Sequence, residues 1–231
     1  MTFECDRSGD RLTLRSPSTR WLSNGFDGGY SNADTAYNLT VPNGFGRTDL
    51  AAYVTERLGS DPTGPVLLTG VDQAHARAAR YGPIFAVVTA GLSNPALLPT
   101  DESENGCSDH QDGSAPPRPG TVNILVGSDE PLTDGGLAGL LATVVEAKTA
   151  TLTDLVGCTG TTSDAVVVGC PEAEGGDEFA GSATAVGNAA RVCVRDALST
   201  ALRARYGDDL PNPLRAEHAT PTSGSATVFQ P

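Results

Sequence analysis

The chain has 231 residues, 39% of them hydrophobic, and its 28 acidic and 15 basic side chains give a formal net charge of -13 with a pI near 4.5. A chain of this size can bury a full core without disulfides or metal ions. The negative charge argues against nucleic acid and against an anionic membrane surface as partners.

Lysine is almost absent from this acidic chain. Lys148 is the only one, whereas an average soluble chain of this length carries on the order of a dozen. Many carboxylates with few lysines and few aromatic residues are typical of proteins that stay soluble in concentrated salt, where repulsion between charges is screened at short range. We therefore expect a cytoplasmic protein of a halophile.

The cysteines and the hydropathy give no sign of secretion. The five cysteines are odd in number and show no C-x-x-C spacing, so we expect buried free thiols and no disulfide framework or zinc ribbon. There is no charged-then-apolar leader and no apolar run of about 18 residues, so we expect neither export nor a membrane span. The cysteines are Cys5, Cys107, Cys158, Cys170 and Cys193.

The first part of the chain predicts strands separated by glycine-rich turns. Residues 3–14 indicate a hairpin, and residues 36–41 and 66–69 indicate strands. Residues 20–30, RWLSNGFDGGY, predict a loop, which is either a plain surface loop or one whose backbone amides approach a ligand closely. Residues 48–58 predict a helix capped by Thr48.

The next segments predict a second pair of elements. Residues 72–80 favour a short helix capped by Asp72, and residues 84–90 favour a strand that ends in a turn at 91–94. Strand ends that run into Gly and Asn are where α/β proteins place ligand groups. Residues 98–120 are acidic and rich in Ser, Gly and Pro, so we expect a mobile insertion loop there.

The second half of the chain alternates strands with two long helices. We expect strands at 121–127 and 165–169, helices at 133–155 and 182–206, and a peripheral tail at 207–231. The whole pattern predicts one domain over residues 1–206, a layered α/β or α+β domain with a mixed β-sheet flanked by helices.

Lys148 lies in the middle of the apolar face of the predicted helix. On a helical wheel, five apolar side chains fall within about 40° of it, and Glu146 lies on the opposite side. The two residues therefore cannot pair within the helix, and a lysine on a buried face either snorkels to solvent or lies beside an anion. The five are Leu137, Leu141, Val144, Leu152 and Leu155.

A hydroxyl-rich loop, C-T-G-T-T-S-D at 158–164, follows that helix. Its hydroxyls and amides can converge on a ligand oxygen, and Asp164 can orient a hydroxyl or act as a base, although such residues also form ordinary turns. The sequence has no G-x-S-x-G, H-E-x-x-H or P-loop pattern. Because His75, His110 and His218 lie far apart in the chain, we expect no histidine metal site and no Ser-His-Asp triad.

An ordered series of segments between about residues 20 and 202 resembles the adenosylcobinamide amidohydrolase (CbiZ-type) family. The segments are L-S-N-G-F-D-G-G with Asn38 downstream, L-L-T-G-V-D, V-V-T-A-G-L-S-N, G-T-V-N-I-L-V, E-A-K-T, T-G-T-T-S-D-A-V-V-V and A-G-S-A-T-A-V-G. The chain departs from the family pattern at Gly70 and Val71, where two alanines are expected, and in its acidic insertion.

The resemblance implies hydrolysis of the amide that joins a propionyl side chain of the corrin ring to aminopropanol, giving adenosylcobyric acid for cobalamin salvage. The corrinoid is then the substrate, and neither a cofactor nor a metal is implied. The matching positions imply a catalytic set and a substrate-binding set. They are Glu146, Lys148, Thr161, Ser163 and Asp164, and Asn24, Asn38, Asp72, Asn94, Thr121, Asn123 and Thr184, respectively.

Three hypotheses remain open at this point, together with the oligomeric state. In the first, Glu146 or Asp164 activates water while Lys148 and the 160–163 loop stabilise the oxyanion. In the second, Thr121 is an N-terminal nucleophile after self-cleavage. In the third, the chain binds corrinoids without catalysis. In each case we expect the anion beside Lys148 to come from residues 161–164 or from the substrate.

Overall fold

The structure is a computed structural model that describes residues 3–99, 120–213, 216, 218–224 and 226–230. Nearly all of the predicted insertion loop, with Cys107 and His110, lies outside the described residues. The described part contains a mixed sheet and three α-helices, which confirms the predicted fold class.

The main sheet has eight strands in the order β4-β3-β2-β10-β8-β6-β5, with β1 paired to the first half of β2. The pairs β8/β10 and β3/β4 are parallel and the others are antiparallel. The strands are β1 (Glu4–Ser8), β2 (Arg11–Ser23), β3 (Gly29–Thr40), β4 (Val66–Thr69), β5 (Arg77–Tyr81), β6 (Ile84–Ala90), β8 (Val122–Ser128) and β10 (Ala165–Pro171).

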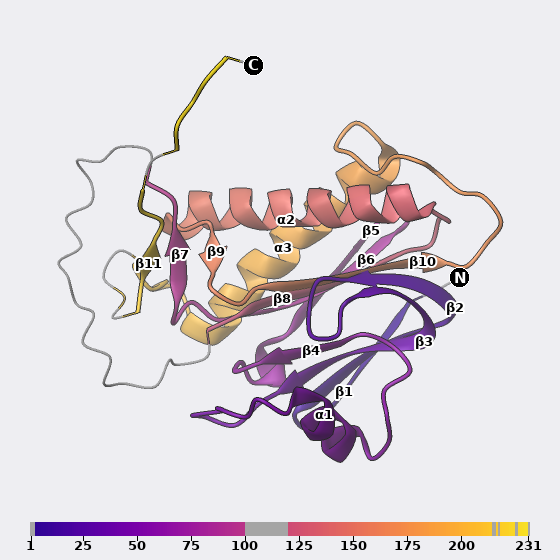
Figure 1. Cartoon of the computed structure of the whole chain (residues 1–231), viewed down its shortest axis with the longest axis horizontal. Helices are drawn as coiled ribbons and strands as arrows, with labels where there is room; N and C mark the ends of the chain where they lie inside the picture. Colours follow the sequence, from indigo (N-terminus) through magenta and orange to yellow (C-terminus); the bar gives the residue numbers. More distant parts are fainter. Residues whose placement is uncertain (1–2, 100–119, 214–215, 217, 225, 231) are drawn as a thin grey trace.

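Two long helices cover one face of this sheet. Figure 1 shows α2 (Asp134–Val156) above β8 and β10, and α3 (Ala185–Tyr206) packs beside it against β5 and β6. Alternate residues of β8, among them Ile124 and Val126, face these helices and form the larger core with side chains such as Leu140 and Val194. The smaller helix α1 (Leu50–Leu58) lies on the opposite side (Figure 1).

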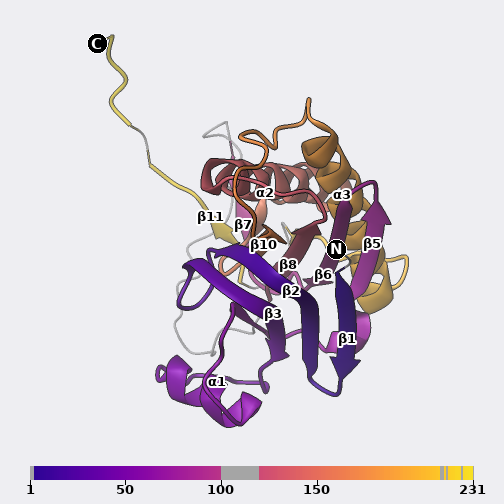
Figure 2. The same ribbon diagram turned by 90° about the vertical axis from the view of Figure 1, so that its right-hand side faces the viewer.

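The other face of β8 is covered by the N-terminal strands. Leu125 of β8 packs in a second core with Phe3 and Trp21, whose rings meet edge to face with centroids 5.8 Å apart. Gly127 leaves room for this contact, since a Cβ there would lie 2.4 Å from the Phe3 ring. Figure 2 shows β1, β2 and β3 at the end of the molecule away from α2.

A small second sheet lies beside the loop that follows α2. Its order is β11-β7-β9, from β7 (Pro95–Leu97), β9 (Gly160–Thr161) and β11 (Thr220–Pro221). Pro95 pairs with Thr161, which brings the turn after β6 against the hydroxyl-rich loop. The predicted tail at 207–231 contributes β11 to this sheet.

Several predicted boundaries are wrong for identifiable reasons. The expected loop at 20–30 is shorter, because β2 continues to Ser23 and pairs with β10. The expected helix at 72–80 is only a 3-10 turn, η1 (Gln73–His75), since residues 77–81 pair with β6 as β5 despite their helix-forming alanines. Its cap, Asp72, is confirmed by a bond from Ala74 N.

The start of α1 also differs from the prediction. The helix begins after Asp49, not Thr48, and the Asp49 side chain makes no capping bond but pairs with Arg47. Burial of the cysteines is confirmed for Cys158, Cys170 and Cys193 but is wrong for Cys5, which is exposed. None of the helices in the described part of the chain has the length and apolar character needed to cross a bilayer.

Candidate active site

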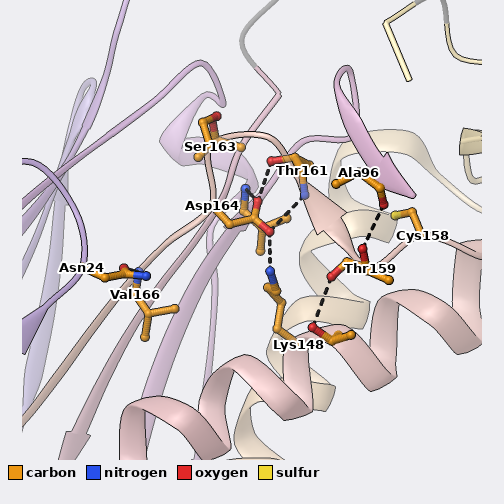
Figure 3. A network of polar contacts seen from close by, with 12 residues as sticks. Asn24, Ala96, Lys148, Cys158, Thr159, Thr161, Ser163, Asp164 and Val166 are labelled. Carbon is orange, nitrogen blue, oxygen red and sulfur yellow. Dashed lines mark hydrogen bonds and ion pairs between the residues drawn. The ribbon is translucent and has the colours of Figure 1, made fainter. Parts of the chain in front are cut away.

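Lys148 lies on the buried face of α2 and pairs with Asp164. Its Nζ donates a hydrogen bond to Asp164 Oδ2, as Figure 3 shows, and the two side chains are only 9% and 10% exposed. The anion therefore comes from the loop at 161–164, the first of the two sources that the sequence analysis left open. A buried ammonium is tolerated because this carboxylate compensates its charge.

Asp164 accepts hydrogen bonds from four donors. Val122 N donates to Oδ1 at 2.9 Å, Thr161 N donates to Oδ2 at 3.0 Å, the Thr161 hydroxyl donates to Oδ1, and Lys148 supplies the fourth bond. An ionised carboxylate offers about four lone-pair positions. These donors therefore occupy Asp164, which holds the start of β8, the loop and α2 together and has no position left for a water proton.

Two hydroxyls meet at the residues that precede Val122 and Asp164 in the chain. Thr121 Oγ1 lies 2.9 Å from Ser163 Oγ, and Ser163 Oγ lies 3.5 Å from the carbonyl oxygen of Gly120. Thr121 is buried whereas Ser163 is exposed, and Figure 3 shows the Ser163 side chain on the side of Asp164 away from Lys148. The buried hydroxyl of Thr121 therefore orients the exposed hydroxyl of Ser163.

Two glycines make these contacts possible. A Cβ on Gly160 would lie 2.4 Å from Asp164 Oδ2 and 2.7 Å from Lys148 Nζ, so the ion pair rests directly on that residue. A Cβ on Gly120 would lie 2.4 Å from Ser93 N, so the turn after β6 packs directly on the residue before Thr121. Gly120 stands in the G-T-V-N-I-L-V motif, but only this tertiary contact explains why a glycine is needed there.

Asn94 borders the same cluster. Its backbone oxygen accepts a hydrogen bond of 3.2 Å from Thr162 N, and its side chain is buried. The structure therefore brings together six of the predicted site residues: Asn94, Thr121, Lys148, Thr161, Ser163 and Asp164.

Glu146 lies outside this cluster. It occupies another face of α2, its side chain is 62% exposed, and it pairs with Arg191 of α3. The wheel correctly separated it from Lys148.

Three other predicted residues bond to backbone near element ends. Asp72 caps η1, Thr184 caps α3 by accepting a hydrogen bond from Gly187 N, and Asn24 Oδ1 accepts one from Val166 N. Asn24 also borders the glycine-rich turn that follows β2, and residues 26–30 of that turn line a cavity of about 120 Å³ away from the cluster.

Asn38 and Asn123 form a buried chain of amides within the sheet. Asn123 Nδ2 donates to Asn38 Oδ1 at 2.9 Å and to Leu68 O at 3.0 Å, and Asn38 Nδ2 donates to Thr89 Oγ1 at 2.9 Å. Asn123 is two residues after Thr121 and faces the same side of β8. These amides link β3, β4, β6 and β8 behind the hydroxyl pair.

Cys158 also lies near Lys148 and Asp164, although nothing in its sequence context indicated a functional role. It is buried, and its pKa is raised mainly by burial and also by the charge of Asp164, against the opposing effect of Lys148. A buried protonated thiol is inert, so Cys158 fits packing better than catalysis. Among the described residues, no group of three or more His, Cys, Asp or Glu side chains could hold a metal ion.

Comparison with known proteins shows to which family the chain is related. The model of the family described as adenosylcobinamide amidohydrolase matches residues 7–209. The chain belongs to the adenosylcobinamide amidohydrolase family. The match covers all six clustered residues and both long helices.

Two curated relatives carry the same description. An adenosylcobinamide amidohydrolase of Halobacterium salinarum is 44% identical over 234 residues, covering 99% of this chain and 100% of the relative. One of Methanosarcina mazei is 27% identical over 151 residues, covering 64% of this chain and 67% of the relative.

Proposed function

We propose that the chain hydrolyses the amide of adenosylcobinamide that joins the corrin propionyl side chain to aminopropanol, giving adenosylcobyric acid. The observation that carries this proposal is the 44% identity, over the whole length of both chains, with the adenosylcobinamide amidohydrolase of Halobacterium salinarum. The corrinoid is the substrate, and the reaction as proposed uses no other cofactor.

The hydroxyl pair is the part of the cluster that we assign to the scissile amide. Amide hydrolysis needs an attacking oxygen, stabilisation of the oxyanion and a proton for the leaving amine. Ser163 is exposed and Thr121 fixes its orientation, so Ser163 is the hydroxyl that substrate can reach.

Lys148 and Asp164 support the loop at 160–163. Asp164 is a positioning residue, since its four donors hold it in one place. Lys148 has the same positioning role, because its ammonium pairs with Asp164 on the side away from Ser163. Glu146 receives no role in this mechanism, because it pairs with Arg191 at the surface.

A second mechanism makes Thr121 an N-terminal nucleophile after cleavage of the Gly120–Thr121 peptide bond. The contact that favours it is the 3.5 Å approach of Ser163 Oγ to the Gly120 carbonyl oxygen, which would polarise that bond. Measurement of the intact mass tests it: two fragments support self-cleavage, and a single active species of 23.6 kDa contradicts it.

The working environment is also part of the proposal. The net charge of -13 and the single lysine support a cytoplasmic enzyme of a halophilic archaeon that recovers corrinoids for cobalamin biosynthesis. The same charge leads us to expect no nucleic-acid partner.

The direct test uses the purified chain in molar potassium chloride with adenosylcobinamide. We expect aminopropanol and adenosylcobyric acid to appear in equal amounts, measured by liquid chromatography and mass spectrometry. Heat-treated protein is the control. Binding of the corrinoid without release of aminopropanol would contradict the proposal and favour the non-enzymatic corrinoid-binding alternative.

A further inference from the structure

Asn94 carries a buried acceptor that has no partner among the described residues. The residue is only 8% exposed, yet its Oδ1 receives no hydrogen bond from the part of the chain that the structure describes. A buried polar atom that has lost water and gained no partner is unfavourable, so its retention needs an explanation. A ligand that brings a donor to this atom would remove the cost.

The backbone around Asn94 is fixed on several sides. Thr162 N donates to Asn94 O, the next residue, Pro95, pairs with Thr161, and Gly120 packs against the amides of Ser93 and Asn94. Asn94 therefore stays beside residues 120–121 and 162–163, which carry the hydroxyl pair. Its position depends on the same elements that position Thr121 and Ser163.

We propose that Asn94 Oδ1 accepts a hydrogen bond from the N–H of the scissile amide. This inference rests on the proposed function and adds the residue that selects an amide at the reacting bond. The substrate amide brings one N–H donor to that bond, and the product carboxylate has none. Asn94 therefore recognises substrate but not adenosylcobyric acid at this position.

The test compares Asn94→Ala with the wild-type enzyme in two measurements. These are kcat/KM for adenosylcobinamide and the inhibition constant of adenosylcobyric acid. We expect kcat/KM to fall by roughly 10-fold to 100-fold, while the inhibition constant stays within about 2-fold. Asn32→Ala is the control, because Asn32 is a surface amide bonded to Arg20 and Glu172, and it should change neither quantity.

Two results would overturn the inference. One is an unchanged kcat/KM in Asn94→Ala, as expected if an ordered water fills the site. The other is an equal loss for substrate and product, as expected if Asn94 only supports the fold. Failure of the wild-type enzyme to release aminopropanol would instead contradict the proposed function itself.

A second variant keeps the test usable if Asn94→Ala does not fold. Asn94→Asp retains the shape and the acceptor oxygen, so we expect kcat/KM for the amide within about 3-fold of wild type. Its charge should repel the product carboxylate and weaken inhibition by roughly 10-fold or more. Loss of amide hydrolysis in a folded Asn94→Asp enzyme would contradict the proposed contact.

Discussion

Asp164 and Glu146 show how the surroundings of a carboxylate decide what it can do. Both were sequence candidates for the base. Asp164 is surrounded by four donors, whereas Glu146 is exposed and pairs with Arg191. Neither arrangement suits proton removal from water at the hydroxyl pair, which shifts attention to Ser163 and Thr121.

The contact between Gly160 and the ion pair gives a stability prediction. Gly160→Ala should displace Lys148 or Asp164 and lower the free energy of unfolding by about 3–5 kcal/mol, as breaking a buried pair does. Turnover of adenosylcobinamide should fall with it. Urea denaturation and aminopropanol release measure the two effects.

Gly139→Ala is the matched control for that variant. Gly139 lies within α2, and a Cβ there would meet Ala180 N only at 3.6 Å, an ordinary contact. This substitution should raise stability by about 0.5–1 kcal/mol, because alanine favours the helix. Equal losses in the two variants would contradict the role given to Gly160.

The exposed hydroxyl gives a kinetic prediction. Ser163→Ala should lower kcat by roughly 100-fold or more, since it removes the hydroxyl that reaches the substrate. Its thermal midpoint should fall by no more than about 2–4 °C, because Ser163 is exposed and the substitution removes its hydrogen bond to Thr121 Oγ1. Steady-state kinetics and thermal melting measure both, and wild-type kcat in Ser163→Ala would contradict the assignment.

At the scale of elements, α2 and α3 are the best-predicted parts of the chain. Apolar periodicity indicated both helices, and Thr133 and Thr184 form their capping bonds with Gly136 N and Gly187 N. The helical wheel of residues 133–155 also placed Lys148 on the face of α2 that is buried. Long amphipathic helices are predictable because one local pattern repeats over several turns.

Edge strands and single polar residues were less predictable. Residues 77–81 favour a helix locally, and only pairing with β6 makes them β5. Asn24 and Thr184 matched the family pattern, but asparagine and threonine serve caps and ligands equally well. The unpartnered oxygen of Asn94 depends on packing between β7 and the 160–163 loop, which one sequence does not reveal.

Thr184 allows the capping and substrate-binding roles to be separated. Thr184→Ala should lower the free energy of unfolding by about 1 kcal/mol, because Gly187 N loses its acceptor. Thr184→Ser keeps the hydroxyl, so its free energy of unfolding should be close to that of the wild-type enzyme. If Thr184 only caps α3, kcat/KM stays at the wild-type value in both variants, and a fall in kcat/KM in folded Thr184→Ala would show contact with substrate.

At the scale of the whole molecule, charge should make stability depend on salt. Repulsion among the carboxylates of a chain with net charge -13 is screened in molar salt and not in millimolar salt. We expect the thermal midpoint to fall steeply as potassium chloride is reduced. An unchanged midpoint across that range would contradict the halophilic interpretation.

Burial of the thiols should make the free energy of unfolding depend on pH in the alkaline range. Burial raises the pKa of Cys193 from 9.0 to about 11. Because the folded-state pKa is the higher one, this contribution to stability is present below about pH 9 and is lost as pH rises through about 11. Urea denaturation at several alkaline pH values should show that loss, and Cys193→Ala should reduce it.

Three variants, compared by the release of aminopropanol from adenosylcobinamide, test whether the reaction depends on the cluster around Asp164. We predict that Asp164→Asn and Lys148→Met each lose roughly 100-fold or more in turnover, while Glu146→Gln stays within about 2-fold of wild type. Near wild-type turnover in Asp164→Asn and Lys148→Met, or loss of turnover in Glu146→Gln alone, would contradict it.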